Sequence, residues 1–422
     1  MNPEDQIYHF YRSNLSQIAR VIEKGKVAIF AGINAIGKTY LFQQVLSNRF
    51  KEKLLENKKT HLVAIDLKDK IGLTTEQILA YWLTQTKETL GLKSEEKEVN
   101  NFSFYSEMTE LIKKLNPDEK ISFVILDFQN TFNCDESFFQ SLIYLQIYSY
   151  GKVSYIVLSE PQILQSKNAG VIRFLEKFEN LRKFNFIKVF DDKTLRADVA
   201  IQGKLLNMDF KKYVSMLVKH SHGYHGISRT SCHLIRDNPD LTDIRKLSKV
   251  FAENSSCQFW VKEIFDSIPR ESIRILKEVV GEKAKFEKYR KNIYGQYLAD
   301  LTFLKKDGTF QYPILLPFLK NYVLSGEEGI PQLKLSGKSF VANGDKIKLT
   351  KKEFMVLETL YKNKGKVVSL DILGEAIWKD NPDEFSLWAI AQIIRRLRKK
   401  LAFYFINPQT LKSVRNEGYI LN

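Results

Sequence analysis

The sequence predicts an α/β domain with a parallel β-sheet and helices on both faces, followed by a helical lid and two winged-helix domains. Short apolar segments alternate with helical stretches through the first half of the chain, the strand signals stop near residue 195, and two later stretches combine helices with turn-linked strands. Parallel strands are buried on both faces, which is why each is a continuous apolar run. A chain of 422 residues has room for about two to four domains.

The first domain is expected over residues 1–195, with strands at 27–31, 62–66, 123–127, 155–159 and 186–190. Over residues 196–255 apolar residues recur at helical steps, which predicts the lid. Over residues 256–326 helical stretches precede an Asp307-Gly308 pair between two apolar runs, a strong hairpin signal. Helices followed by a hairpin indicate the first winged-helix domain.

The charge balance favours a polyanionic partner. Lys and Arg number 65 against 49 Asp and Glu, a formal net charge of +16, which favours nucleic acid or a membrane surface over a merely basic protein. The cysteines Cys134, Cys232 and Cys257 lack metal-ligand spacing and are expected to be buried fillers in a reducing interior. The start has no signal-peptide pattern and no apolar run is long enough to cross a membrane. We therefore expect a cytoplasmic protein.

A phosphate-binding loop is predicted where the apolar strand at 27–31 runs into G-x-x-x-x-G-K-T. Its glycines allow backbone angles that point successive N–H groups inward, Lys38 can reach the β- and γ-phosphates, and the Thr39 hydroxyl can hold Mg²⁺. A helix follows at once, so its positive end faces the phosphates. The residues expected to hold the nucleotide are Gly32, Asn34, Ala35, Ile36, Gly37, Lys38, Thr39 and Tyr40.

Polar residues at the ends of two later strands complete the predicted site. Asp127 follows four apolar residues, and a carboxylate there is costly to bury unless it pairs with a cation, which favours a magnesium ligand over a helix cap. Ser159 and Glu160 end another strand at the sheet edge where ligands bind. Glu160 is a candidate catalytic base, and a turn cap before Pro161 is an equal alternative.

These motifs resemble the P-loop ATPases of the AAA+ and STAND type over roughly residues 15–326. The resemblance implies ATP as the nucleotide, Lys38 and Asp127 as catalytic residues with Asp127 in the Walker B position, and Ser159 as a sensor-like residue. The chain departs from the family at Phe128, where a second acid usually follows the aspartate. We therefore expect slow, Mg²⁺-dependent hydrolysis and a nucleotide that acts as a switch. The arginine that would contact the γ-phosphate is left open among Arg173, Arg182, Arg196 and Arg229.

The last domain, residues 331–422, begins with residues that alternate about an Asn343-Gly344 turn. A capping box from Thr350 to Glu353 opens a helix, Ser369 is positioned to cap a second, and the last helix is expected over 384–401. That helix has one apolar stripe, and the run 395–400 carries no acid, which favours a phosphate-facing helix over a solvated face. The residues opposite the stripe are Trp388, Gln392, Arg395, Arg396 and Lys399.

The order and spacing of these pieces resemble the winged-helix DNA-binding domain of the OmpR/PhoB response regulators. The resemblance implies that Trp388, Gln392, Arg395, Arg396 and Lys399 bind double-stranded DNA, with the last four in the major groove, and that Arg415 on the wing meets the backbone or minor groove. Asn416 stands where the family usually has glycine. An ATPase-like domain takes the place of the receiver domain.

The favoured hypothesis is an ATP-responsive, DNA-binding transcriptional regulator, in which nucleotide changes the assembly of copies of the chain or the exposure of the DNA-binding domain. One alternative is an ATPase that remodels DNA or a protein complex and is tethered by its winged helix. The other is a signalling scaffold whose winged helices bind protein partners.

Overall fold

The computed structural model describes residues 2–93, 99–178, 185–281, 286–305, 307–322, 333–337, 339–342, 345–347, 349–378, 386–403, 410–414 and 417–421. The chain separates into two compact units. One unit joins Met1–Ala252 to Glu263–Leu316, and the other joins Glu253–Lys262 to Pro317–Asn422. Among the described residues, no helix is long and apolar enough to span a membrane.

A parallel five-stranded sheet forms the centre of the first unit, as the sequence predicts. Its strands, in the order β2-β3-β4-β1-β5, are β2 Thr60–Asp66, β3 Lys120–Leu126, β4 Val153–Ser159, β1 Val27–Ala31 and β5 Asn185–Phe186. Strand β4 lies between β1 and β3, and its last residue, Ser159, is in register with Ala31. The phosphate loop after β1 and the residues that follow β3 and β4 therefore meet at one edge.

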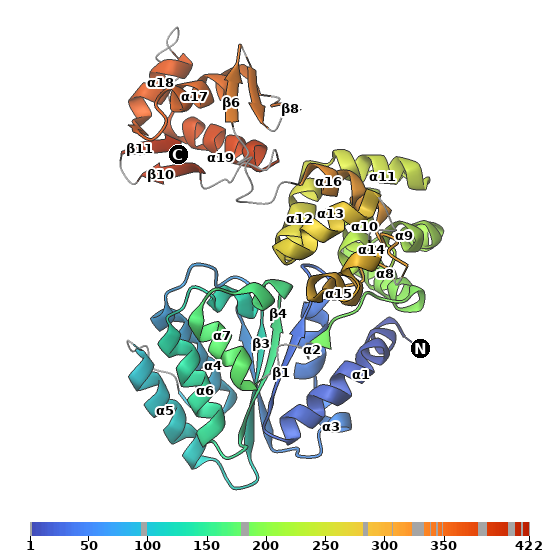
Figure 1. Cartoon of the computed structure of the whole chain (residues 1–422), viewed down its shortest axis with the longest axis vertical. Helices are drawn as coiled ribbons and strands as arrows, with labels where there is room; N and C mark the ends of the chain where they lie inside the picture. Colours follow the sequence, from blue (N-terminus) through green and yellow to red (C-terminus); the bar gives the residue numbers. More distant parts are fainter. Residues whose placement is uncertain are drawn as a thin grey trace. The chain divides into compact units, whose positions relative to one another are not determined.

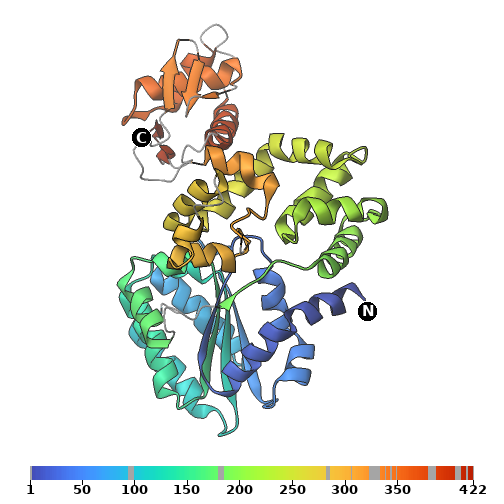
Figure 2. The same cartoon turned by 45° about the vertical axis from the view of Figure 1, so that its right-hand side comes forward.

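Helices cover both faces of this sheet (Figures 1 and 2). On one side lie α1 Pro3–Glu23, α2 Lys38–Leu46 and α3 Asn48–Leu54, and on the other α4 Thr75–Thr89, α5 Asn101–Lys114, α6 Glu136–Tyr148 and α7 Ala169–Phe178. The core beneath the second group includes the fully buried Trp82. Burial on both sides explains why alternate strand residues are equally apolar.

Two predicted elements of this unit differ from the structure. The strand expected over 186–190 ends at Phe186, because the Phe190 N–H donates to the Gly223 carbonyl at 2.9 Å instead of extending the ladder. Within the helical stretches expected over 256–326, residues 286–300 form two helices, α14 Phe286–Tyr289 and α15 Ile293–Asp300. Asn292 separates them, since its side chain accepts from Tyr294 N and caps the second helix.

The lid region is helical, as its periodicity predicts. It contains α8 Asp192–Leu206, α9 Val214–Ser221, α10 His225–Asp237 and α11 Ile244–Glu253. Helices α12 Ser255–Asp266 and α13 Arg270–Gly281 follow, and α16 Leu316–Asn321 comes later. The expected hairpin is reduced to one antiparallel bridge between Leu304 and Phe310, with Gly308 at φ +78° in its turn. Helix α12 starts in one compact unit and ends in the other.

The C-terminal unit carries two small antiparallel sheets around a helical core. The first is β6 Leu333–Ser336, β7 Ser339–Ala342 and β8 Asp345–Lys346, while the expected Asn343-Gly344 turn lies outside the described residues. The helices are α17 Lys351–Lys362, α18 Leu370–Trp378 and α19 Leu387–Phe403. The second sheet has the order β10-β11-β9, from β10 Leu411–Val414, β11 Gly418–Leu421 and β9 Val367–Val368.

At the starts of α17, α18 and α19, a Thr or Ser hydroxyl accepts a hydrogen bond from a backbone N–H of the first turn. Thr350 and Glu353 form the complete capping box of α17. The Ser369 hydroxyl accepts from Ile372 N at 3.3 Å in α18. The last helix begins at Leu387, where the Ser386 hydroxyl accepts from Ala389 N at 3.3 Å, and the expected start at residue 384 lies outside the described residues.

Two cations of the basic run in α19 have structural partners within the domain. Lys400 Nζ donates to Glu353 Oε2 at 2.6 Å, and Glu353 is only 2% exposed. Arg398 donates to the Leu411 carbonyl at 2.8 Å and to the Ser413 hydroxyl at 2.9 Å. Burial would raise the pKa of Glu353, but hydrogen bonds from Lys400 and Thr350 outweigh it and leave the pKa lowered. Part of the basic run therefore stabilises the domain.

Replacing Lys400 by Met should destabilise the C-terminal domain by about 2 kcal/mol at neutral pH, because the buried Glu353 carboxylate loses its cation. A carboxylate with a lowered folded pKa stabilises above its unfolded pKa, so the difference from wild type should shrink as the pH falls toward about 4. Hydrogen exchange of the α17 and α19 amides in the full chain measures this. The exposed Lys364→Met is the control, and equal protection in Lys400→Met and wild type would contradict the prediction.

Candidate functional site

The loop between β1 and α2 requires glycine at two positions because other side chains of the protein pack against its backbone. Gly37 has φ +117°, and a Cβ there would lie 2.5 Å from the Tyr11 hydroxyl, which donates to the Gly37 carbonyl at 3.2 Å. A Cβ on Gly32 would come within 2.8 Å of Ile36 Cγ2. Helix α2 starts at Lys38, directly after this turn. The first amides of α2 thus follow a tight glycine turn, and the unpaired N–H groups at a helix start are suited to bind a phosphate group.

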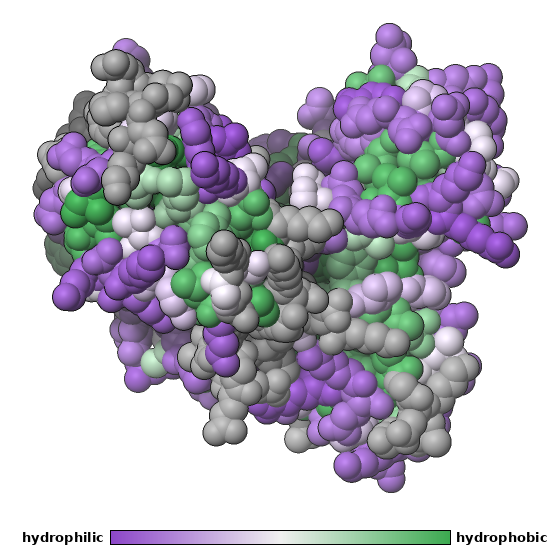
Figure 3. Space-filling view, turned by 90° about the horizontal axis from the view of Figure 1, so that it is seen from above, coloured by the Kyte–Doolittle hydropathy of each residue, from purple (hydrophilic) through white to green (hydrophobic). Residues whose placement is uncertain are grey.

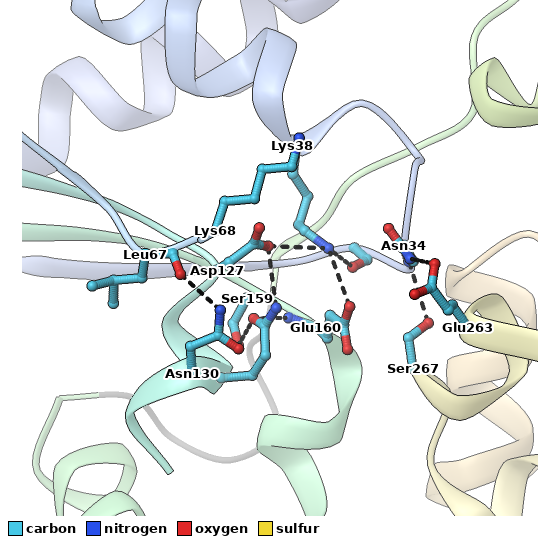
Figure 4. A network of polar contacts seen from close by, with 12 residues as sticks. Asn34, Lys38, Leu67, Lys68, Asp127, Asn130, Ser159, Glu160, Glu263 and Ser267 are labelled. Atoms are coloured by element: carbon cyan, nitrogen blue, oxygen red, sulfur yellow. Dashed lines mark hydrogen bonds and ion pairs between the residues drawn. The ribbon is translucent and has the colours of Figure 1, made fainter. Parts of the chain in front are cut away.

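Lys38 is the buried cation of this site, with 6% of its surface exposed. Its Nζ donates to the Gly32 carbonyl at 3.1 Å and lies 3.6 Å from Asp127 Oδ1 and 3.9 Å from Glu160 Oε1 (Figure 4). The structure therefore brings together the three residues that the sequence offered as catalytic, from α2 and from the ends of β3 and β4.

Asp127 turns the chain sharply where β3 ends. It has φ 56° and ψ 48°, a left-handed conformation that costs a non-glycine residue about 1 kcal/mol or more. The next residue, Phe128, is fully buried, and its ring lies 5.5 Å from the Phe174 ring centroid and 6.1 Å from that of Phe139. The position that usually carries the second acid therefore points into the core.

Gln129 is a site residue that the sequence did not single out. Its Nε2 donates to Asp127 Oδ1 at 3.2 Å, and its Oε1 accepts from the Ser159 hydroxyl at 3.3 Å and from Glu160 N at 3.1 Å. The only signal in the sequence is an amide two residues after the aspartate. This side chain links the ends of β3 and β4, which bear the predicted site residues.

Glu160 lies among negative charges. Burial raises its pKa, Lys38 opposes the rise, and Asp127, Glu263 and Asp266 add to it. A buried carboxyl with raised proton affinity is suited to accept a proton, which a general base must do. Glu160 precedes the 3₁₀ turn Pro161–Gln165 but makes no side-chain cap hydrogen bond there. The absence of this hydrogen bond counts against the cap alternative, and the role of Glu160 as a base stays a prediction.

The apex of the loop contacts α12 and the lid. Asn34 N donates to the Ser267 hydroxyl at 3.2 Å, and Asn34 Nδ2 donates to Glu263 Oε2 at 3.3 Å (Figure 4). The Tyr224 hydroxyl donates to the Asn34 carbonyl, and Gly226 N donates to the Ala35 carbonyl at 3.1 Å. Two of the expected nucleotide-binding residues are therefore tied to helices distant in the sequence.

Ile36, Thr39 and Tyr40, which are also expected to bind the nucleotide, differ in their exposure to solvent. Ile36 is buried, whereas Thr39 is exposed in the first turn of α2. The Tyr40 hydroxyl donates to Asp198 Oδ1 at 3.1 Å, and the other oxygen of this fully buried carboxylate lies 2.9 Å from His225 Nδ1. Tyr40 thus joins α2 to the lid helices α8 and α10.

No three His, Cys, Asp or Glu side chains among the described residues gather closely enough to hold a metal ion by themselves. Of the candidate arginines, Arg173 pairs with Glu136, Arg196 and Arg229 are exposed, and Arg182 lies outside the described residues.

On α19 the expected DNA-binding residues are largely accessible. Trp388 is 73% exposed, Arg395 and Arg396 are exposed, and Gln392 is half-buried. The Lys399 side chain and Arg415 lie outside the described part of the chain. The buried side of the helix consists of Ile390, Ile393, Ile394, Leu397 and Leu401. On the face of the molecule in Figure 3, hydrophilic side chains surround smaller apolar areas.

Residues 344–421 match the family described as "Transcriptional regulatory protein, C terminal". This segment is a transcriptional regulatory domain. It is similar to the regulatory protein VanR of Enterococcus faecium, with 39% identity over 77 residues, which is 18% of this chain and 33% of VanR. It is also similar to PhoP of Escherichia coli, with 38% identity over 90 residues, 21% of this chain and 39% of PhoP. The chain spans 33% and 39% of the length of these two relatives.

Two solved structures that resemble most of the chain are a protein titled a Walker-type ATPase and one titled an ORC2 protein in ADPNP and ADP complexes. The Walker-type ATPase PABY2304 of Pyrococcus abyssi is 13% identical with a TM-score of 0.49, covering 73% of this chain and 95% of its own. The ORC2 protein of Aeropyrum pernix is 11% identical with a TM-score of 0.43, covering 74% and 94%. Likeness at this level assigns no activity, so the function rests on the site itself.

Replacing Phe128 by Glu should not restore the missing acid to the site. The new carboxylate would be buried among aromatic rings, which should cost about 3 kcal/mol or more. Phe128→Leu is the matched control and should lose less, about 1–2 kcal/mol. Urea unfolding of the full chain, with hydrogen exchange of the α6 and α7 amides, measures both. A Phe128→Glu protein of wild-type stability with faster ATP hydrolysis would show that position 128 reaches the site.

Proposed function

We propose that this protein is an ATP-binding, nucleotide-switched regulator of transcription that binds double-stranded DNA. The observation that carries the proposal is the buried Lys38 between two carboxylates at a glycine-lined loop, in the same chain as a transcriptional regulatory domain. Such a regulator would act in the cytoplasm, and its nucleotide would alter the DNA-binding domain, the assembly of copies of the chain, or both.

The residues of the loop suit ATP with Mg²⁺. The amides of the loop and of the first turn of α2 would hold phosphate oxygens, Lys38 would balance their charge, and the Thr39 hydroxyl and Asp127 would hold the metal. Mg²⁺ supplies charge neutralisation when it is bound. The chain's own contribution is to keep the ammonium of Lys38 in place through Gly32, Asp127 and Glu160.

Hydrolysis is expected to be slow because Phe128 occupies the position of the second acid and is buried. Glu160 is the best-placed base, yet its ion pair with Lys38 must weaken before its carboxylate can accept a proton from water. A long-lived nucleotide complex suits a switch better than a motor. This counts against the DNA-remodelling interpretation.

Helix α12 offers a route from the nucleotide to the DNA-binding unit. Its last turn and the residue after it supply Glu263 and Ser267 to the loop apex, whereas residues 253–262 belong to the C-terminal unit. A phosphate that takes the Asn34 N–H must displace Ser267, and its negative charge repels Glu263 and Asp266, which already act on Glu160. Nucleotide and the acidic end of α12 would therefore compete for the loop.

The DNA-binding half of the proposal rests on the charge of the last domain. Residues 331–422 carry 17 Lys and Arg against nine Asp and Glu. Arg398 and Lys400 make hydrogen bonds within the domain. Arg395 and Arg396 are exposed on α19, where they would contact DNA phosphates or bases. Trp388, Gln392, Lys399 and Arg415 are proposed to complete the interface.

Single replacement of Arg395 or Arg396 by Ala should weaken DNA binding about tenfold and reduce the slope of log affinity against log salt by about 1. Lys53→Ala, which removes an exposed cation from the first unit, should leave both values unchanged. Fluorescence anisotropy with duplex DNA at several salt concentrations measures them. Equal affinities and slopes for all proteins would favour a protein partner for the winged helix.

Addition of ATP and Mg²⁺ should change the DNA affinity or the assembly state of the wild-type chain, and Lys38→Ala should abolish the response. Gel-shift titration and sedimentation velocity measure these quantities. Ser267→Ala should still bind nucleotide but respond less, because the contact between the loop and α12 is lost. Unchanged affinity and assembly in wild type, with nucleotide bound, would rule out the coupling, and rapid DNA-stimulated turnover would favour a remodelling enzyme.

A further inference from the structure

The hydrogen bonds of Gln129 occupy both ends of its amide. The Nε2 donor goes to Asp127 Oδ1, and the Oε1 acceptor takes the Ser159 hydroxyl and the Glu160 amide. An amide can make this bridge and a carboxylate cannot, because only the amide offers a donor to Asp127 and an acceptor to its other partners. Gln129 is thus matched to both of its neighbours.

The backbone directs Gln129 into the site. The left-handed Asp127 leads into the 3₁₀ turn Phe128–Thr131, where Asn130 N donates to the Asp127 carbonyl at 3.0 Å. Within this turn Phe128 is fully buried and Gln129 contacts the polar groups at the ends of β3 and β4. Asn130 goes elsewhere, since its Nδ2 donates to the Leu67 carbonyl at 2.8 Å.

We propose that Gln129 is the positioning residue of the nucleotide site, which orients the Asp127 carboxylate toward Mg²⁺ and fixes it relative to Ser159 and Glu160. This inference rests on the proposed function, because it assumes that the site binds ATP with Mg²⁺. The residue does not replace the missing acid as a base. It holds the metal ligand of one strand against the candidate base of the next.

Removal of a hydrogen-bond partner behind a metal ligand typically lowers metal affinity about 10- to 100-fold. The informative quantity is therefore the ratio of nucleotide affinities with and without Mg²⁺. If Asp127 loses its orientation, the nucleotide affinity should fall only when Mg²⁺ is present. General damage to the loop should instead lower the nucleotide affinity both with and without Mg²⁺. The ratio separates a positioning role from a structural one and requires no turnover.

The test uses the full chain and a fluorescent ATP analogue, titrated with Mg²⁺ and with excess EDTA. In Gln129→Met, which keeps the length of the side chain and removes both polar ends, the affinity ratio should fall about tenfold while the Mg²⁺-free affinity stays near wild type. Asn130→Ala is the matched control, because it removes a neighbouring amide that does not contact Asp127. Its ratio should equal that of wild type.

A second variant keeps the shape and changes the charge. Gln129→Glu places a carboxylate against Asp127, and two such groups about 3 Å apart do not both ionise readily. Protons and Mg²⁺ should compete for this pair, so the affinity ratio should fall more steeply between pH 8 and pH 6 than it does in wild type. Binding of this variant is measurable even if Gln129→Met folds poorly.

Each outcome decides one question. A wild-type ratio in Gln129→Met, or a wild-type pH dependence in Gln129→Glu, overturns the positioning role. A parallel loss of both affinities also overturns it, since that marks a structural contact. If the wild-type chain binds no nucleotide with or without Mg²⁺, the proposed function itself fails. That outcome is distinct from failure of the positioning role, which requires nucleotide binding by the wild-type chain.

Discussion

The buried ammonium of Lys38 is the interaction on which the nucleotide-binding side of the molecule depends. A cation that is 6% exposed is costly unless nearby groups compensate its charge. The Gly32 carbonyl, Asp127 and Glu160 provide that compensation from three parts of the chain. They converge because β4 pairs with β1 and β3 follows β4 in the parallel sheet, so the ends of both strands lie at the same sheet edge, on one side of the loop. The order of the strands in the sheet therefore determines which residues surround Lys38.

The turn at Asp127 divides its neighbourhood into an apolar side and a polar side. Its left-handed conformation costs free energy, which the burial of the Phe128 ring offsets. The same turn brings Gln129 to the ends of β3 and β4. The burial of position 128 and the amide bridge of Gln129 are thus two consequences of one backbone conformation. A substitution at position 128 alone would not convert this site into that of a fast hydrolase.

The sequence predicted elements that depend on local chemistry, and it missed contacts between distant segments. Strands such as Val27–Ala31 are continuous apolar runs, and the capping box of Thr350 depends on residues three apart, so both were visible. Ser267 binds Asn34 across more than 200 residues of chain, and Lys400 reaches Glu353 on another helix. Helical periodicity places Arg398 and Lys400 on a surface and cannot show that other parts of the domain supply their partners.

The charges around the loop explain why a switch is the more natural use of this site than rapid turnover. Glu160 lies near Lys38 but also near Asp127, Glu263 and Asp266, so the surroundings of the loop are rich in negative charge. A polyphosphate must be drawn in by Lys38 and the loop amides against these acids. Asp127 and Glu160 are fixed by the Gln129 bridge, whereas Glu263 and Asp266 belong to α12, whose first turns lie in the other compact unit. Under the proposed function, movement of α12 would relieve this repulsion, and nucleotide binding would then displace a helix whose first turns belong to the other compact unit.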